Sequence, residues 1–465
     1  MKLQHFVIPI VTCIGLSACG SSSSGDTAPT PQPPVVTPPE TPVVIEDISC
    51  SPSYGLPIHQ AFLSSNNVNI DTLFDTQKTA NSSWLAPALD ASVVIELEHP
   101  SQVKALVITW ADTQNIHQFD IYASKDSEEW ELLDTTTQSN QDTLIPDVIA
   151  LSEDTDNAST AVYLRIDLKG TDTSEPSEII EVEAFGCRQE ASHNIELIDW
   201  YMSVPTDVDN NGKSDSIKED DLADGYFDPR FFNLTEDGGI AFATSVSGYR
   251  TSTNTKYVRS ELREMLRRGN TAYSTQGVNG NNWVFSSAPQ QDLDNAGGID
   301  GELHAELSVN HVTSTGEDYQ IGRVIIGQIH ANDDEPARLY YRKLPDNENG
   351  AIYLAHELLD GDDTYYEIIG SRSNTADNPE DGIPLNERFS YSIIVEGNDL
   401  EVSITKEDGT TYSQLVDMSD SGYDEGNQYM YFKAGVYNQN NSGDQHDYVK
   451  ATFYKIDNSH TGYQE

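Results

Sequence analysis

The sequence predicts an all-β protein with two successive β domains. Short runs in which apolar and polar residues alternate recur along the chain, and polar turns separate them, as in strands with one buried face. Glycine and proline are frequent, with 31 and 21 residues, and long apolar runs are few. A chain of 465 residues is also long enough for two or three domains, each with a core of its own.

The composition is strongly acidic. The sequence has 26 Lys and Arg against 76 Asp and Glu, which gives a formal net charge of −50. This excludes generic nucleic-acid binding, because affinity for a phosphate backbone comes from clustered cations. The same charge repels anionic substrates unless cations gather locally. A site for an anion should therefore coincide with a local cluster of Lys and Arg.

Residues 1–19 are predicted to be a lipoprotein signal peptide. The stretch from Phe6 to Leu16 is mostly apolar but too short to span a bilayer as a mature helix. The segment from Leu16 to Cys19 resembles the bacterial lipobox, whose cysteine becomes the first mature residue and carries acyl chains. Cys19 is thus the predicted lipidation site, and Gly20 after it favours the bacterial outer membrane, at the cell surface or on the periplasmic face. We expect this lipid anchor to be the only contact with the membrane.

Residues 20–46 are rich in Ser, Pro and Thr and are predicted to be an unfolded linker. Of the four cysteines, Cys13 would leave with the signal peptide and Cys19 would be acylated. Cys50 and Cys187 remain, and in an oxidising compartment we expect them to form a disulfide. Closing so long a loop would stabilise the first domain by about 4 to 5 kcal/mol on the chain-entropy model.

Residues 47–190 are predicted to form an antiparallel β-sandwich, because alternating runs at 93–97, 105–110, 119–123 and 163–168 are separated by polar turns. The pattern resembles that of the discoidin-like (F5/8 type C) carbohydrate-binding modules. The matching landmarks are Trp84, 119–126, Trp130, 163–166 and 181–186.

This resemblance implies a domain whose loops bind sugar. Trp84, Trp110 and Trp130 are candidates for stacking on a sugar ring, although a tryptophan within an apolar run is more often part of a core. Many members of that family hold a structural calcium ion near the strand entry, and here Asp75 and Glu181 are the candidate ligands.

The segment 207–215 has the spacing of a calcium loop, with oxygen-bearing side chains at alternate positions and Gly212 at the turn. However, Lys218 stands where a bidentate carboxylate would be needed, and no helix pattern flanks the segment. We expect an Asx-rich turn without metal.

The cations gather between residues 250 and 268. Six basic residues lie there against only two acidic ones, Glu261 and Glu264; the basic residues are Arg250, Lys256, Arg259, Arg263, Arg267 and Arg268. In a strand over 257–265, a period of two puts Tyr257, Arg259, Glu261 and Arg263 on one face. Planar guanidinium groups suit carboxylate ligands. The alternative is a surface ladder of ion pairs, which contributes little energy.

Two later strands favour a binding face over such a ladder. Residues 323–330 form an apolar run that ends with Gln328 and His330 on one face. Residues 429–439 place five residues on one face at the same period: Tyr431, Lys433, Gly435, Tyr437 and Gln439. Three strands that each present polar, ionisable side chains indicate a concave sheet face that holds a charged polymer.

The three blocks resemble the signature of the alginate lyases of polysaccharide lyase family 7. Its R-x-E-L-R, Q-I-H and Y-F-K-x-G-x-Y-x-Q motifs stand at 259–263, 328–330 and 431–439, in the family's order. The resemblance spans roughly 195–457 and implies that residues 191–465 are a β-jelly-roll domain. It implies a monomeric enzyme that cleaves alginate by β-elimination and needs no cofactor for catalysis.

The resemblance also implies the roles of the site residues. Arg259 and Gln328 would neutralise the uronate carboxylate, so that the neighbouring C5 hydrogen can leave as a proton. His330 and Tyr437 would be the base and the acid, with roles that depend on the uronate epimer. Neighbouring uronates would be bound by Arg263, Tyr431, Lys433 and Gln439, with Glu261 orienting the two arginines. The isoleucine of Q-I-H accompanies activity on guluronate-containing blocks, either G or MG.

Other functions remain open at this stage. One is a non-catalytic cell-surface lipoprotein that binds polysaccharide, and another is a lyase that acts on a different polyuronate such as glucuronan. A retaining glycosidase needs two carboxylates about 5 Å apart, and no E-x-D-x-x-E strand motif is present. Whether cleavage is internal or from chain ends is expected to depend on the loops 289–301 and 371–384.

Overall fold

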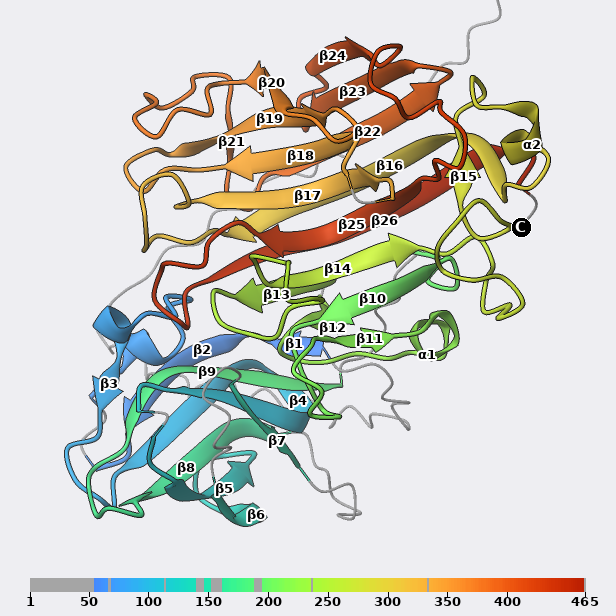
Figure 1. Ribbon diagram of the computed structural model, residues 1–465. Coiled ribbons are helices and arrows are strands. Elements are labelled where there is room, and N and C mark those ends of the chain that lie inside the picture. Colours follow the sequence, from blue (N-terminus) through green and yellow to red (C-terminus); the bar gives the residue numbers. More distant parts are fainter. Residues whose placement is uncertain are drawn as a thin grey trace, which may run out of the picture. The chain divides into compact units, whose positions relative to one another are not determined.

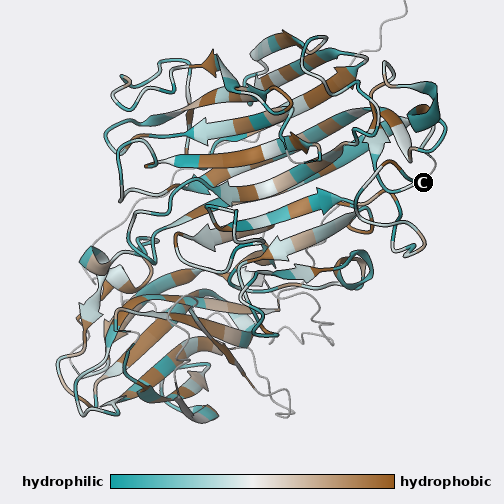
Figure 2. Cartoon of the chain, in the orientation of Figure 1, coloured by the Kyte–Doolittle hydropathy of each residue, from teal (hydrophilic) through white to brown (hydrophobic). Residues whose placement is uncertain are grey.

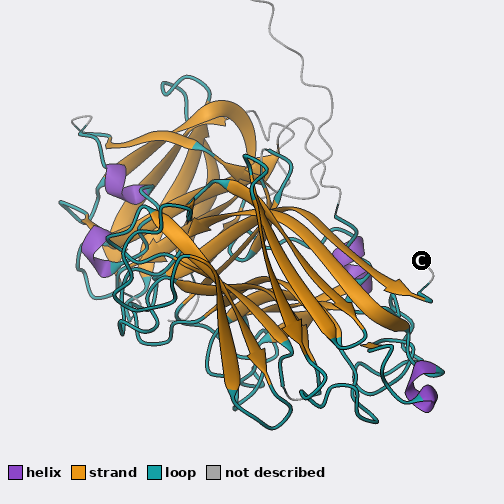
Figure 3. Ribbon diagram, turned by 90° about the horizontal axis from the view of Figure 1, so that it is seen from above, coloured by secondary structure: helices purple, strands orange, loops and turns teal. Residues whose placement is uncertain are grey.

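The computed structural model describes most of the chain after residue 53 (Figure 1). The described residues are 54–65, 68–112, 114–138, 146–151, 161–187, 195–235, 237–332 and 334–463. The predicted signal peptide, Cys19, the linker and Cys50 lie outside these ranges. Strands dominate the described part, and its helices are short: α1 (Glu219–Ala223), α2 (Gln290–Leu293) and the 3-10 turns η1 (Asp71–Leu73) and η2 (Ala80–Ser82) (Figure 3). The predicted all-β class is confirmed.

The first domain has two antiparallel sheets that share one long strand. One sheet has the order β2 (Ile58–Leu63), β4 (Ser92–Trp110), β8 (Ala161–Thr171), β5 (His117–Ser124) and β6 (Glu131–Gln138). The second half of β4 continues into the other sheet, where it pairs with β9 (Glu178–Cys187) and β7 (Asp147–Ala150). There β9 also pairs with β1 (Tyr54–Leu56) and β3 (Trp84–Leu85).

The core of this domain follows the alternation read from the sequence. Alternate residues lie in the core, as in Val93, Ile95 and Leu97 on β4 and Leu164, Ile166 and Leu168 on β8. The second half of β4 is buried on both faces, at 105–110. Trp110 is 4% exposed, and its ring stacks on His117 with 4.0 Å between ring centroids. It is therefore a core residue, and its candidacy as a sugar platform was wrong. Trp84 and Trp130 are half-buried.

The second domain is a sandwich of two sheets. The sheet that carries the candidate site, called the groove sheet below, has nine strands (Figure 1). Eight follow in the order β11 (Asp215–Ile217), β10 (Trp200–Val204), β14 (Arg259–Glu264), β25 (Tyr431–Asn438), β17 (Arg323–His330), β18 (Ala337–Arg342), β19 (Asn349–Glu357) and β20 (Asp363–Ile369); β21 (Ile383–Pro384) pairs with β19.

The opposite sheet, called the back sheet, packs behind the groove sheet. Its order is β24 (Thr411–Asp417), β23 (Asp399–Lys406), β22 (Arg388–Glu396), β16 (Gly298–His311), β26 (Tyr448–Thr461), β13 (Ile240–Ser245) and β12 (Phe232–Leu234), and β15 (Trp283–Val284) runs parallel to β16. Apolar side chains of both sheets form one large core. Full burial of a Leu or Phe side chain contributes about 1.5 to 3 kcal/mol, so this core holds the strand faces in register.

The polar faces of β14 and β25 lie where a period of two predicts. Leu262 on β14 and Phe432 and Val436 on β25 are fully buried in the core. The alternate side chains of both strands, Arg259 and Lys433 among them, lie on the other face. Figure 2 shows this alternation as changes of hydropathy along the strands.

A bulge in β17 was not predicted. Its register with β18 and β25 shifts between Ile325 and Gly327. Ile326 and Ile329 lie in the core, while Ile325 packs on the other side against Tyr437. The shift thus lets Ile325 and His330 share the outer face although their numbers differ in parity.

Two glycines permit this arrangement. A Cβ at Gly327 would lie 2.7 Å from the hydroxyl of Tyr391, which donates to the Ile326 carbonyl at 3.0 Å. Gly435 has φ +131, and a Cβ there would lie 2.7 Å from the Ser260 carbonyl on β14. A Cβ atom would collide at either position, so each requires glycine. At Gly435, the glycine of the Y-F-K-x-G-x-Y-x-Q motif, the missing side chain lets β14 and β25 approach closely.

Candidate active site

The three sequence motifs meet at the centre of the groove sheet. The central strand β25 pairs with β14 on one side, where Arg259 lies opposite Tyr437 and Glu261 opposite Gly435. On its other side β25 pairs with β17, where Gln328 lies opposite Lys433 and His330 opposite Tyr431. Residues more than 100 positions apart in the chain thus become direct neighbours. The antiparallel register of the three strands brings the motifs together, and no single motif predicts these pairings.

A hollow of about 780 Å³ lies over these strands. Seven of the nine predicted site residues line it: Arg259, Arg263, His330, Tyr431, Lys433, Tyr437 and Gln439. The other two, Glu261 and Gln328, are 2% and 1% exposed and lie beneath it. The hollow is large enough for several sugar units and is lined mainly by polar groups, as a site for a charged polymer must be.

Glu261 holds a cluster of cations together. Its Oε2 accepts from Arg259 Nη1 at 2.8 Å and lies 2.5 Å from Lys433 Nζ, and its Oε1 accepts from the Gln328 amide. Burial opposes a charge on Glu261, but Lys433 and Arg259 outweigh this effect and lower its pKa. One carboxylate thus orients two cations, and the cluster keeps a net positive charge toward the hollow.

Tyr437 lies against this cluster. The guanidinium carbon of Arg259 is 3.7 Å from the centroid of its ring, and Tyr257 packs edge-on against the same ring at 6.2 Å. Burial raises the pKa of Tyr437, although the charge of Arg259 opposes the shift. The phenol is therefore neutral near pH 7, which makes it a proton donor.

His330 has a defined tautomer. Its Nδ1 lies 2.7 Å from the Ala331 carbonyl oxygen, which only accepts, so Nδ1 carries the hydrogen and Nε2 keeps its lone pair. Its ring stacks on Tyr431 with 5.0 Å between centroids. Burial lowers the pKa of His330 to about 4; Lys433 and Arg259 act in the same direction, and Glu335 opposes them. The imidazole is neutral near pH 7 and suited to accept a proton at Nε2.

Comparison with known proteins agrees with this geometry. Residues 195–460 match the family model described as alginate lyase, which is more than half of the chain. This chain belongs to the alginate lyase family. The enzyme is 54% identical to an alginate lyase of Klebsiella pneumoniae over 274 residues, which covers 57% of this chain and 89% of that protein.

Two solved structures of alginate lyases match the same part of the chain, and the first supports the same family. The crystal structure of the alginate lyase from Klebsiella pneumoniae matches with a TM-score of 0.57 and 53% identity, over 58% of this chain and 98% of that one. An alginate lyase of Pseudomonas aeruginosa matches with a TM-score of 0.42 and 28% identity, over 57% of this chain and 99% of that one. The lyase is a polysaccharide lyase with a jelly-roll domain, and the family match does not extend to residues 54–187.

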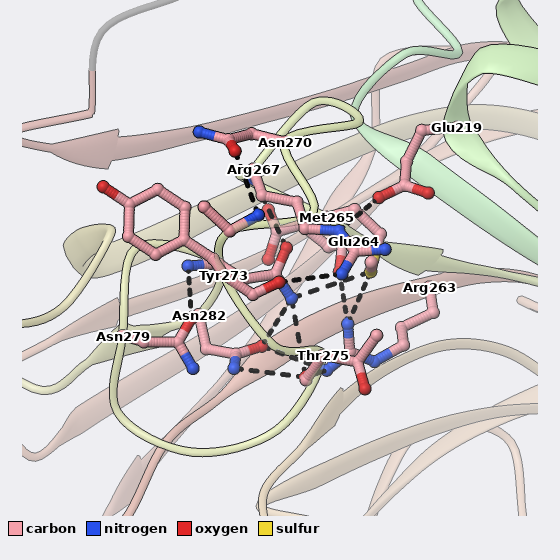
Figure 4. Close-up of polar contacts among 12 residues, drawn as sticks. Glu219, Arg263, Glu264, Met265, Arg267, Asn270, Tyr273, Thr275, Asn279 and Asn282 are labelled. Atoms are coloured by element: carbon pink, nitrogen blue, oxygen red, sulfur yellow. Dashed lines mark hydrogen bonds and ion pairs between the residues drawn. The ribbon is translucent and has the colours of Figure 1, made fainter.

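The predicted orientation of Arg263 was wrong. It was expected to be oriented by Glu261, but Nη1 donates to the Glu264 carbonyl and to Met265 Sδ, and Nη2 to the Thr275 carbonyl and Asn282. Figure 4 shows this cage. Arg263 also lies 3.8 Å from the centroid of the Tyr431 ring. The side chain thus fixes the 270–282 loop and supports Tyr431, with little donor capacity left for substrate.

The other cations of the 250–268 segment also differ in whether they contact protein partners or line the hollow. Arg267 donates to Glu219 at 2.7 Å and to the Tyr273 carbonyl at 2.9 Å, and Arg268 pairs with Asp199 at 2.9 Å (Figure 4 shows the Arg267 contacts). Lys256 lines the hollow of the lyase. A local count of charge identifies the cluster but not which of its members a loop will enclose.

Several lining residues of the lyase were missed. They include the polar loop 251–255, Gln276, Glu335 and Arg338. The loops 289–301 and 371–384, which were expected to decide how open the groove is, contribute no residue to this hollow. Glu335 follows His330 by five residues across a turn. This short spacing could have predicted that Glu335 lies near His330.

Calcium at Asp75 and Glu181, the two predicted ligands, is not confirmed. Ca²⁺ takes six to eight oxygen ligands. Asp75 already accepts from the Gln77 amide at 2.7 Å and from Ser82 at 2.5 Å. Burial raises the pKa of Glu181 to about 9, and its Oε2 is buried without a hydrogen-bond partner in the protein. Among the described residues no group of three or more His, Cys, Asp or Glu side chains is placed to hold a metal ion.

The 207–215 segment is a turn stabilised by its own carboxylates, as predicted. Asp207 accepts from the backbone amides of Asn211 and Gly212, both at 2.8 Å, and Asp215 accepts from Val208 at 2.9 Å.

In the part of the lyase that the structure describes, no helix is long and apolar enough to cross a bilayer.

Proposed function

We propose that this lyase cleaves 1,4-linked uronate chains of alginate by β-elimination and releases unsaturated oligouronates. The observation that carries the proposal is the Arg259–Glu261–Lys433 cluster beside Tyr437 and His330. On a protein with a formal net charge of −50, this buried positive cluster is the feature that an anionic chain requires.

Arg259 has the task of neutralising the uronate carboxylate at the scissile bond. A free carboxylate opposes removal of the adjacent C5 hydrogen, because the developing carbanion adds a second negative charge. Gln328 assists: one of its two amide hydrogens is engaged with Glu261 and the other is left for the substrate. A preorganised donor at a developing charge is worth about 3 to 4 kcal/mol.

His330 and Tyr437 would carry out the proton transfers. In one geometry Nε2 of His330 takes the C5 proton, the C4–O4 bond breaks as C4=C5 forms, and the Tyr437 hydroxyl protonates O4. Mannuronate and guluronate present the C5 hydrogen on opposite faces, so for the other epimer Tyr437 serves as both base and acid. The first assignment uses the protonation states of the free site, a neutral imidazole and a neutral phenol. The second needs the Tyr437 phenolate, which takes the C5 proton and returns it to O4, and the charge of Arg259 beside the ring favours this form.

Neighbouring uronates would contact the walls of the hollow. Gln439 lines it, and its buried Nε2 has no hydrogen-bond partner in the protein, so a substrate oxygen would satisfy it. Lys433 supplies charge, and Tyr431 supplies a ring held between His330 and Arg263. Arg263 acts mainly through Tyr431.

We also propose a preference for guluronate-containing blocks, G or MG. Ile329, the residue that accompanies this preference, is fully buried in the core, so its influence must pass through the neighbouring Gln328 and His330. The test is the rise in ultraviolet absorbance of the unsaturated product on polyguluronate, polymannuronate, mixed blocks and glucuronan. A faster rise on polymannuronate would refute the preference, and a rise on glucuronan alone would refute the substrate class.

The first domain is proposed to hold polysaccharide as a discoidin-like module. A hollow of about 430 Å³ on the outer face of its five-stranded sheet is lined by Phe62, Trp130 and Arg165, together with the polar side chains of Gln60, Ser64, Asn69 and Ser127. The Arg165 guanidinium lies 4.6 Å from the Trp130 ring centroid and 4.4 Å from that of Tyr122. An aromatic ring beside an oriented guanidinium suits an acidic sugar.

Arg165→Ala in a full chain that carries Tyr437→Phe is expected to weaken binding of long alginate about 10- to 150-fold, because a charged hydrogen bond of about 1.5 to 3 kcal/mol is lost. Lys125→Ala, an exposed cation outside this hollow, is the matched control. Calorimetric titration measures both, and equal affinity of the two variants would count against this module site.

The N-terminal predictions lead to a proposal about the mature protein. It would begin at acylated Cys19 in the bacterial outer membrane, with Cys50 and Cys187 joined. The intact mass of the membrane-extracted protein tests this. We expect the mass of residues 19–465 plus acyl chains, and an increase of about two mass units on reduction, since two thiols form from one disulfide. A start at residue 1 or 20, or no change on reduction, would contradict it.

A further inference from the structure

Glu335 is a charged residue of the groove that the proposed reaction does not yet use. It lies in the connection between β17 and β18, and it lines the same hollow as His330. Its Oε1 is 3.3 Å from His330 Nε2. This nitrogen is the one that keeps its lone pair, because Nδ1 donates to the Ala331 carbonyl. A carboxylate therefore stands beside the atom that would gain the proton.

The charges around the imidazole make this contact significant. Lys433 and Arg259 both disfavour a positive charge on His330, and so does its burial; the ring of Tyr431 is neutral. Glu335 is the acidic group that opposes them at contact distance. Without it, an imidazolium formed at this position would face two cations and no adjacent anion.

A network behind Glu335 fixes its orientation. Its Oε2 lies 3.7 Å from Arg338 Nη1, and its backbone amide donates to Glu357 at 3.3 Å. Arg338 is also paired with Glu357 at 3.3 Å and with Asp363. Because Oε2 is directed at Arg338, Oε1 is left for His330. This division holds the carboxylate toward the imidazole rather than toward solvent.

We propose that Glu335 is a positioning residue that stabilises the imidazolium formed when His330 Nε2 takes the C5 proton. The C5–H bond breaks, the N–H bond forms, and the new positive charge pairs with Oε1 of Glu335, while the electron pair of C5–H forms C4=C5 and the C4–O4 bond breaks. The inference rests on the proposed role of His330 as a base. It adds that only the epimer that uses this base depends on Glu335.

Glu335→Gln tests the proposal, with Glu357→Gln as the matched control. Both variants remove a carboxylate from Arg338, but only the first removes the charge beside His330. We expect Glu335→Gln to lower kcat about 10- to 100-fold on one of polyguluronate and polymannuronate, with KM and the rate on the other polymer within about twofold. Glu335→Asp, which restores the charge, should recover part of the loss. Glu357→Gln should leave the ratio of the two rates unchanged.

His330→Asn identifies the polymer that depends on the base. If it slows one polymer and Glu335→Gln slows both equally or neither, the role of Glu335 is refuted while the base assignment stands. If His330→Asn slows neither polymer, the base assignment fails and the role of Glu335 fails with it. Equal losses for Glu335→Gln and Glu357→Gln on both polymers would indicate a purely structural network and would also refute the proposal.

Discussion

Tyr437→Phe is expected to lower kcat/KM on alginate about 10²- to 10⁴-fold, the range for loss of a positioned general acid. The substitution removes only the hydroxyl oxygen, and the ring keeps its contacts with Arg259 and Tyr257. Because O4 of both epimers would leave toward this hydroxyl, we expect the loss on polyguluronate and on polymannuronate alike. Product absorbance at saturating and at limiting substrate separates the effect on kcat from that on KM.

Tyr257→Phe is the matched control for this variant. Tyr257 lines the same hollow and packs against the Tyr437 ring, and its hydroxyl accepts from Gln320 at 3.4 Å. We expect its kcat/KM within about threefold of the wild type, because no proton transfer is assigned to it. A comparable loss in both variants would mean that packing of the aromatic pair, and not the Tyr437 proton, limits the rate.

The strand faces of the groove sheet were predictable because they depend on local sequence. A period of two suffices to put Arg259, Glu261 and Arg263 on one side of β14, and burial of Leu262 fixes which side. The order of the motifs along the chain then identified the family. Pattern and resemblance together gave the fold class and most of the residues that line the hollow.

The partners of those side chains were not predictable in the same way. Arg263 has the same spacing from Glu261 as Arg259 has, yet the 270–282 loop folds back and takes its donors. Glu335 reaches His330 across a turn, and the β17 bulge changes the parity of the face. Such contacts depend on where loops return to the sheet, which alternation of apolar and polar residues does not encode.

A buried ion pair behind the groove sheet gives the largest expected effect on stability. Glu264 on β14 and His460 on β26 have fully buried side chains, and their Oε1 and Nε2 atoms are 2.8 Å apart. Glu264 also accepts from the Phe432 amide at 3.0 Å and from Asn458 at 2.7 Å. It thus joins two strands of the groove sheet to the back sheet, and its removal leaves several buried donors unsatisfied.

Glu264→Gln is therefore expected to lower the free energy of unfolding by about 3 to 5 kcal/mol, the range for breaking one side of a buried pair. Glu302→Gln is the control, since Glu302 pairs with His304 at 3.1 Å on the exposed face of β16, where a pair is worth about 0 to 1 kcal/mol. Urea unfolding near pH 6 measures both variants. A loss below 1 kcal/mol for Glu264→Gln would show that the buried carboxylate is compensated locally.

The pH dependence of stability is a second test of the Glu264–His460 ion pair. Burial opposes a charge on His460, but Glu264 and hydrogen bonds to Glu264 and to the Asp300 carbonyl outweigh it and raise its pKa. A raised folded-state pKa means that this contribution is complete below the unfolded-state value of about 6.5 and is lost as the pH rises through the folded-state value. Wild-type protein should therefore lose stability over this interval. Glu264→Gln should lose much less there, because its imidazole no longer holds the extra proton in the folded state, and parallel curves for the two proteins would assign the wild-type loss to other groups.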